Sequence, residues 1–473
     1  MSATGHAGAA RFIEGPITPT LARFALPLLV TNFLHSISGT WGAIWVGQVL
    51  GANALTAVVT ANVIMFMVMG SAMGIGTAAG VAIGQSLGAG DLRAVKRVAG
   101  SAVAFIIGLS LALAGAGWLL APAIVDGIGT PAAARGFAIT HLRFTCLAMP
   151  SIFTYIVMMM MLRATGDART PFRFTLLWIG GTMVLTPLLL TGAFGLPGLG
   201  IASLGLAALL ANGLALGTLV GYVYLKRSPI ALHGEDLQHL RPDPVLLRLL
   251  VKRGVPLALE AVLVQGAYFV LLSSVNSHGA ATAAAYAAAA QLWGYVQLPS
   301  NALAAAMTAM AAMNIGADRW DRVEKIALRG CGLSFAVSVA ATALLYALGD
   351  APLKLFVPAG GEVLAIAWHI NLIALWGWIA LSATMGLFGI MRANGAMLAP
   401  MLIFALTMWV FRVPFALGLQ PLLGASAIWW SFPFGTVCSA LAAWGWYRWG
   451  GWRNQRPMLA DLDSQIEEGH VGE

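Results

Sequence analysis

Ionisable side chains are rare inside the long apolar runs of this chain, and these few could do chemistry there. Glu260 is the one carboxylate within such a run; the other acids fall in loops, at run ends or in the tails. A charge is costly inside a membrane, so such a residue is a functional candidate by default. Apolar burial favours the neutral form, and Glu260 could therefore exchange a proton or bind a cation. The alternative is simple pairing with Lys252, Arg253 or water.

Two histidines and one amide are the second candidates. His35 and His369 lie in apolar runs, and histidine titrates near physiological pH. Asn371 lies two residues after His369 and adds an amide oxygen that could help to hold an ion. For each histidine the alternative is a neutral, hydrogen-bonded side chain that only packs. No His, Cys, Asp or Glu spacing typical of a metal site occurs, and Cys146 and Cys331 are scattered in apolar runs. We therefore expect no bound metal or organic cofactor, only H⁺ or Na⁺ as a coupling ion.

The composition predicts an integral membrane protein. The chain has 473 residues, of which 59% are hydrophobic and only 9% are charged. A soluble domain carries about 25% charged residues, so lipid must be the main solvent. Hydropathy divides the chain into about twelve apolar spans, each long enough to cross a bilayer as a helix. The predicted fold class is therefore all-α, and the bilayer is its first partner.

The placement of the basic residues predicts orientation. Almost all Lys and Arg fall in the two tails and in loops that follow even-numbered spans, whereas the opposite side carries Arg135 and Lys354. By the positive-inside rule, both termini are expected in the cytoplasm of a bacterial cell whose inner membrane holds the protein. The same spread along one rim argues against nucleic acid as a partner of this basic chain, whose net charge is +8.

The chain repeats itself at an offset of 229 positions. LRATGDARTP, residues 162–171, recurs as MRANGAMLAP, residues 391–400, and a proline early in the first span recurs early in the seventh. The matched pairs are Arg163 with Arg392, Gly166 with Gly395, and Pro27 with Pro256. Two six-span halves with one orientation follow the parallel-repeat plan of some transporters. A proline kinks a helix, so Pro27 and Pro256 are candidate hinges.

The predicted domains follow this repeat. They are an N-terminal tail at 1–17, an N-lobe at 18–225, a linker at 226–248, a C-lobe at 249–448 and a C-terminal tail at 449–473. The linker holds several charges and three prolines, which is typical of a loop between halves. Two lobes make a complete transporter, so a monomer is sufficient.

At this point the sequence resembles the MATE multidrug and toxin extrusion transporters, in their prokaryotic branch. The resemblance rests on LP early in the first span, GQSLGAGDLRAVKR after the second, LRATGDARTP after the fourth and FRVPFAL in the eleventh, and it covers residues 15–448. It implies a V-shaped pair of six-helix lobes that exports drug-like, often cationic small molecules in exchange for Na⁺ or H⁺. It also implies that Arg163, Gly166, Arg392 and Gly395 are structural, and that Arg412 braces its lobe.

The sequence departs from this family where coupling acids are usual. Gly42 stands where relatives often have an acid in the first span, and Thr182 and Thr186 stand where the branch often has Asn and Asp. Many relatives have a Glu about two turns after the proline of the seventh span, whereas Glu260 comes one turn after Pro256. The N-lobe ion site of the branch is therefore expected to be absent.

Aromatic and amide side chains in mid-span are the candidates for a substrate cavity. An aromatic face can hold a cation, and adaptable apolar groups suit many substrates. Each of these residues has packing or lipid contact as its alternative role. The candidates are Trp41, Gln291, Trp293, Asn301 and Trp376.

Other classes of function remain as alternatives. A lipid or lipid-linked glycan flippase would need a basic cavity, and Arg143 and Arg412 are the intramembrane cations available for one. An uncoupled facilitator would keep the fold without the ion site. An enzyme would need a polar cluster at membrane depth, and no such pattern occurs, so we expect none.

Overall fold

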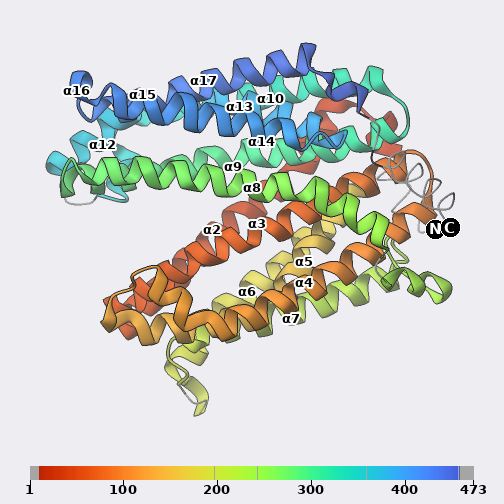
Figure 1. Cartoon of the computed structure of the whole chain (residues 1–473), viewed down its shortest axis with the longest axis horizontal. Coiled ribbons are helices and arrows are strands. Elements are labelled where there is room, and N and C mark those ends of the chain that lie inside the picture. The colour runs from red at the N-terminus through yellow and green to blue at the C-terminus, as the bar shows by residue number, and fades with distance from the viewer. Residues whose placement is uncertain (1–9, 196–197, 242, 358–359, 456–457, 459–473) are drawn as a thin grey trace. The chain divides into compact units, whose positions relative to one another are not determined.

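A computed structural model describes residues 10–195, 198–241, 243–357, 360–455 and 458. The predicted tails therefore lie partly outside the described residues, at 1–9 and in most of 456–473. Each predicted span coincides with a helix or with a run of consecutive helices (Figure 1). Those of the first half are α2 (Ile17–Leu50), α3 (Ala52–Gly88), α4 (Leu92–Gly127), α5 (Ala132–Ala164), α6 (Arg169–Thr191) and α7 (Ala202–Leu225).

The second half repeats this order, with two interrupted spans. A bend of 48° separates α12 from α13, and a π-helical segment, η3, interrupts the eleventh span. Such segments are rare and often occur at functional sites. The elements are α8 (Pro244–Asn276), α9 (Ala280–Gly316), α10 (Trp320–Leu348), α12 (Gly361–Ala374), α13 (Gly377–Ala393), α14 (Leu398–Ala405), η3 (Leu406–Arg412), α15 (Val413–Gly418) and α17 (Ser426–Trp449).

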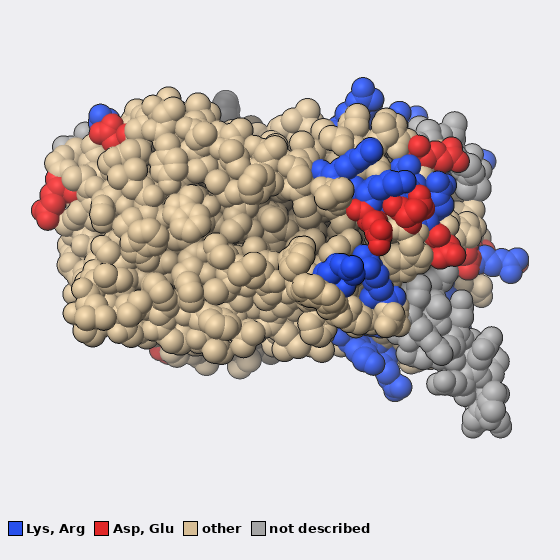
Figure 2. Space-filling model, turned by 90° about the horizontal axis from the view of Figure 1, so that it is seen from above, with Lys and Arg blue, Asp and Glu red and all other residues tan. Residues whose placement is uncertain are grey.

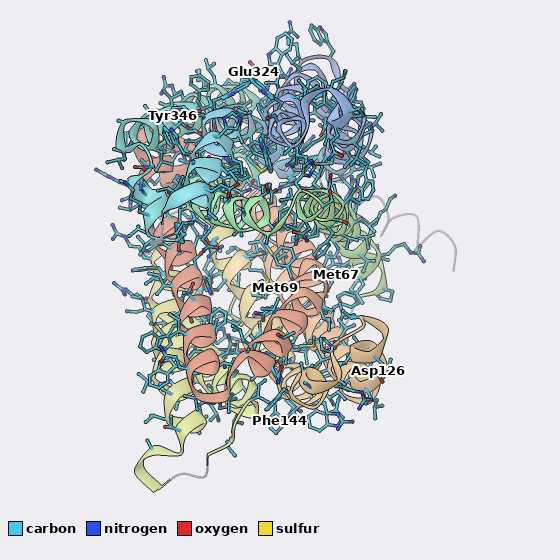
Figure 3. The ribbon with its side chains drawn as sticks, turned by 90° about the vertical axis from the view of Figure 1, so that its left-hand side faces the viewer. Met67, Met69, Asp126, Phe144, Glu324 and Tyr346 are labelled. Atoms are coloured by element: carbon cyan, nitrogen blue, oxygen red, sulfur yellow. The ribbon has the colours of Figure 1, made fainter. Side chains whose placement is uncertain are left out.

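The helices have the lengths and surfaces of membrane spans. Within the described part of the chain, nine are long and apolar enough to cross a membrane, and the bent pair α12–α13 makes a tenth. Figure 2 shows Lys and Arg gathered at one end of the helices, next to a broad belt without charged side chains. Figure 3 labels two charged residues near helix ends, Asp126 on α4 and Glu324 on α10. The all-α membrane fold is confirmed.

The helices form two compact units that exchange the starts of two helices. Unit 1 includes residues 30–255, and unit 2 includes residues 11–29 and 256–460. Helix α2 therefore begins in unit 2 and continues in unit 1, whereas α8 begins in unit 1 and continues in unit 2. The lobes predicted from the sequence repeat divide in the linker, and this division stays a prediction; the compact units change at residues 29–30 and 255–256. Both changes of unit fall beside the candidate hinges Pro27 and Pro256.

Specific contacts hold each exchanged segment. In unit 1, the start of α8 packs closely on α3, because a Cβ added at Gly254 would lie 3.1 Å from the carbonyl carbon of Gly74. In unit 2, Asn314 on α9 donates to the Phe12 carbonyl at 3.0 Å, and Arg322 on α10 donates to the Gly15 carbonyl at 2.8 Å. Small residues allow the first contact, and buried hydrogen bonds provide the second.

The linker is folded against unit 1. Its short helix η2 (Gly234–Leu240) packs on α4, where Lys96 donates to the Asp236 carboxylate at 2.6 Å and Arg97 pairs with Asp243. Gly100 allows the close approach, since a Cβ there would lie 2.6 Å from the His239 carbonyl oxygen. The linker is therefore a docked element of this unit.

Replacing Gly100 by Ala should displace η2 from α4, because the added methyl group has no space. We expect a nitroxide label at position 238, on a chain whose native cysteines are replaced, to become more mobile in Gly100→Ala. Gly108→Ala on the same helix is the matched control, since nothing lies within 4 Å of its Cβ. Equal mobility in both variants would show that the linker does not depend on this contact.

Acid should release the same element. The Lys96 ammonium holds the pKa of Asp236 below its usual range; burial raises the pKa of Asp243, but Arg97 outweighs it, and that pKa is also lowered. Docking is therefore favoured above the ordinary aspartate pKa of about 4 and is lost as the pH falls through the lowered values. The label at 238 should become mobile only below about pH 4. In the double variant Asp236→Asn, Asp243→Asn, the label at 238 should be mobile at neutral pH as well.

Candidate functional site

The carboxylate of Glu260 forms an ion pair with Arg392. One terminal nitrogen of the guanidinium lies 2.6 Å and 2.8 Å from the two carboxylate oxygens. Glu260 is 16 residues from either end of α8, and the two side chains are only 13% and 19% exposed. The partner is thus neither of the bases expected from the sequence, Lys252 and Arg253. The assignment of Glu260 to ion coupling stays a prediction, but the residue has a fixed counter-charge.

A tight turn follows the corresponding arginine in each half, Arg392 and Arg163. Arg392 lies in the last turn of α13, and Gly395 follows with φ +84° and donates its N–H to the Arg392 carbonyl at 2.8 Å. The first half repeats this turn, because Gly166 has φ +83° and bonds to the Arg163 carbonyl at 3.0 Å. Glycine adopts positive φ without strain, which explains why RxxG is written twice.

The arginine of the first half has a different environment. Among the described residues Arg163 makes no ion pair, and its Nε is buried without a hydrogen-bond partner. Arg163 lies near His35 of α2 and near Tyr155, which precedes it by eight residues along one side of α5. The Trp178 ring packs edge-on against both, with centroids 4.8 Å and 5.6 Å away, and joins them in one cluster. The sequence indicates separate roles for His35 and Arg163, but it does not predict that Trp178 and Tyr155 bring them into one cluster.

The predicted ion residue Asn371 and the predicted cavity residue Trp293 are bonded to each other. The indole N–H of Trp293 donates to the Asn371 side-chain oxygen at 2.8 Å, and both residues are buried. Trp293 also stacks on Phe432 at 5.7 Å and contacts Tyr286 edge-on at 5.8 Å. Both side chains therefore pack in the interior of unit 2, and their roles in ion coupling and in the substrate cavity stay predictions.

The remaining candidates are more accessible. His369, Gln291 and Asn301 are exposed. Trp376 is 36% exposed and lies at the bend between α12 and α13. Trp41 is half-buried and donates its indole N–H to the Met183 carbonyl at 3.0 Å. Trp41 belongs to unit 1 and the other four residues belong to unit 2, and the roles of all five remain predictions.

The positions where relatives often have acids contain no ionisable group here. Thr182 donates its hydroxyl to the Trp178 carbonyl at 3.0 Å, Thr186 is buried, and nothing lies within 4 Å of a Cβ built at Gly42. Within the described residues no three His, Cys, Asp or Glu side chains come together as metal ligands would. Among the acids that the structure describes, Glu260 lies at the middle of a long apolar helix, and its ion role stays a prediction.

Arg412 packs within the second half. Its guanidinium lies 5.0 Å from the centroid of Phe432, and it donates to the Met408 sulfur at 3.6 Å. A Cβ added at Gly435 of α17 would lie 3.1 Å from the Arg412 Cβ. These contacts join η3 to α17 and are consistent with the bracing role, which remains a prediction.

These helices and their repeat define a multi-pass membrane transporter built from two similar halves. The MatE family model matches residues 27–188 and again residues 256–417, at the same offset of 229 positions. The chain therefore belongs to the MATE family, whose members are transporters and not enzymes. The resemblance seen in the motifs is confirmed.

Curated relatives agree over nearly the whole chain. The "Probable multidrug resistance protein YoeA" of Bacillus subtilis (strain 168) is 30% identical over 431 residues, which are 91% of this chain and 93% of the relative. The "Probable multidrug resistance protein YpnP" of the same organism is 26% identical and covers 93% and 97%. A crystal structure of MATE in complex with MaD3S has a TM-score of 0.86 at 19% identity and covers 94% and 99%, which supports the fold.

Removing either partner of the Glu260–Arg392 pair should destabilise the protein more than removing both. A lone buried charge costs about 3–5 kcal/mol, whereas the double variant leaves none. We expect a coupling energy of about 1–3 kcal/mol from a cycle of Glu260→Gln, Arg392→Gln and the double variant, measured by unfolding in detergent.

The exposed pair Glu324–Arg453, at 3.1 Å, is the matched control. Its cycle should give about 1 kcal/mol or less, because solvent screens exposed pairs. Equal coupling energies in the two cycles would show that burial does not strengthen the Glu260–Arg392 pair.

Proposed function

We propose that this MATE-family transporter exports drug-like small molecules from the bacterial cytoplasm in exchange for inward H⁺ or Na⁺. Two curated relatives that cover most of the chain are probable multidrug resistance proteins, which supports the cargo class. The Glu260–Arg392 pair supports the coupling part of the proposal, because a carboxylate in the middle of a helix can bind either an arginine or an ion.

Competition for one carboxylate gives a coupling step. A proton or Na⁺ at Glu260 neutralises the carboxylate and removes the attraction that holds Arg392. Since Arg392 ends α13 and Glu260 lies on α8, loss of the pair frees these two helices to move apart. An ion gradient would then bias the equilibrium between two conformations, by the difference in ion affinity between them.

The exchanged helix starts offer a place for that movement. Pro27 and Pro256 lie where α2 and α8 pass from one compact unit to the other. Proline removes an intrahelical hydrogen bond, so bending there costs less than elsewhere in the helix. Alternating access by bending at these two prolines, with both termini in the cytoplasm, completes the proposal.

An uncoupled facilitator is the second candidate. Its supporting observation is the same ion pair, because a carboxylate held by an arginine at 2.6 Å already has a counter-charge and needs no ion. The absence of acids at Gly42, Thr182 and Thr186 points the same way. The two candidates differ in whether a gradient drives net export.

Efflux of a fluorescent cationic dye from proteoliposomes tests the proposal. We expect an imposed pH gradient or an imposed Na⁺ gradient to drive export by the wild type, and Glu260→Gln to lose the response to that gradient. Glu324→Gln is the matched control, since this acid lies in the first turns of α10 and is exposed. It should transport as the wild type does.

Dye binding to the purified variants separates lost coupling from lost folding. Glu260→Gln should still bind dye at equilibrium. Gradient-driven export by that variant at the wild-type rate would refute the coupling role of Glu260. Dye equilibration that neither gradient drives uphill would favour the facilitator.

A further inference from the structure

The corresponding arginines of the two halves, Arg163 and Arg392, have different partners. Subtracting the repeat offset of 229 from Glu260 gives Thr31 on α2, just as it gives Arg163 from Arg392. The second half therefore has a Glu–Arg ion pair where the first half has Thr31 and Arg163. Each arginine lies in the last turn of its helix and is only partly exposed, and a guanidinium withdrawn from water normally has a counter-charge. The chain supplies one for Arg392 and, among the described residues, none for Arg163.

The groups around Arg163 also differ from those of the second half. His35, Tyr155 and Trp178 correspond by the same offset to Val264, Thr384 and Thr407. The first half thus replaces an aliphatic and two small side chains by an imidazole and two aromatic rings. His35 follows Thr31 by four residues and so lies on the same face of α2. The position of the missing acid is therefore next to this cluster.

The cluster is accessible as well as cationic. Arg163, His35 and Trp178 are all half-buried, while Tyr155 is buried and its hydroxyl is 3.1 Å from that of Thr175. The acid nearest to Arg163 in the sequence is Asp167, whose carboxylate accepts from the backbone N–H groups of Arg169 and Thr170 at 3.0 Å and 2.9 Å. The other described acids of unit 1 lie at the ends of α4 or in the linker. A flat ring, two nitrogen donors and no acid favour a planar ligand with a negative end.

We propose that Arg163 and His35 bind the carboxylate of an amphipathic small molecule, in the place that Glu260 occupies in the other half, with Trp178 and Tyr155 as the wall for its apolar body. This inference rests on the proposed export function and narrows its cargo class: this transporter would accept organic carboxylates, in addition to or instead of cations.

Equilibrium binding of two matched probes to the purified full-length protein tests the site. The probes are 1-naphthoate and its uncharged analogue 1-naphthamide, which share one ring system. We expect the wild type to bind naphthoate about tenfold more tightly, as charge-assisted hydrogen bonds to arginine favour the anion. Equal affinity for the two probes would overturn the proposal.

Restoring the acid of the repeat gives the sharpest variant. Thr31→Glu should supply Arg163 with the partner that Arg392 already has, and the preference for naphthoate should disappear. Thr31→Gln is the matched control, because it has the same size without charge and should keep the preference. Arg163→Lys should weaken naphthoate binding, since lysine lacks the planar fork. If Thr31→Glu does not fold, Arg163→Lys still decides, because an unchanged preference for naphthoate in Arg163→Lys refutes the site.

Two further comparisons separate this proposal from others. The first adds phosphatidylglycerol or phosphatidylcholine to the detergent micelles and tests whether a lipid phosphate is the natural ligand. If phosphatidylglycerol displaces naphthoate and phosphatidylcholine does not, the carboxylate assignment is overturned. The dye assay in proteoliposomes needs no naphthoate. Intact dye export without naphthoate binding would refute this site alone, and naphthoate binding without gradient-driven export would refute the export proposal alone.

Discussion

A guanidinium withdrawn from water is costly without a counter-charge, and the two halves of the molecule differ in whether the chain provides one. The RxxG turn ends a long helix in each half and places one arginine in its last turn. In the second half, Glu260 at the middle of α8 satisfies Arg392 and ties α8 to α13. Neither group is stable there alone, so the pair links folding to any event that neutralises the carboxylate.

The fold was predictable because its signals repeat along the sequence. Apolar runs of membrane length and the 229-residue offset between Pro27 and Pro256 require no knowledge of packing. The family model, which begins its two matches at these prolines, confirms that division. The exchange of helix starts was not predictable, because it depends on long-range contacts such as Asn314 with Phe12.

The site was only partly predictable, for a related reason. Carboxylates are rare in the apolar runs, and this rarity indicates Glu260. Its partner Arg392 lies 132 positions away and falls among the loop bases that predict orientation. Its position in the repeated turn was a signal that could have found it. The aromatic residues gave no such signal, because a mid-span tryptophan looks the same to the sequence whether it faces a cavity or, like Trp293, packs against Asn371.

The difference between the halves carries the functional argument further. A repeated backbone supplies two equivalent places for an arginine, and evolution of the two halves can then change the partner of one without changing the fold. A carboxylate from the chain at one place makes a latch that an ion can open. Thr31 at the other leaves Arg163 without an intramolecular acid, and the surrounding rings of Tyr155 and Trp178 give that place a shape. The two proposals together assign the response to ions to one half and the selection of cargo to the other, and antiport is then a coupling free energy between these two sites.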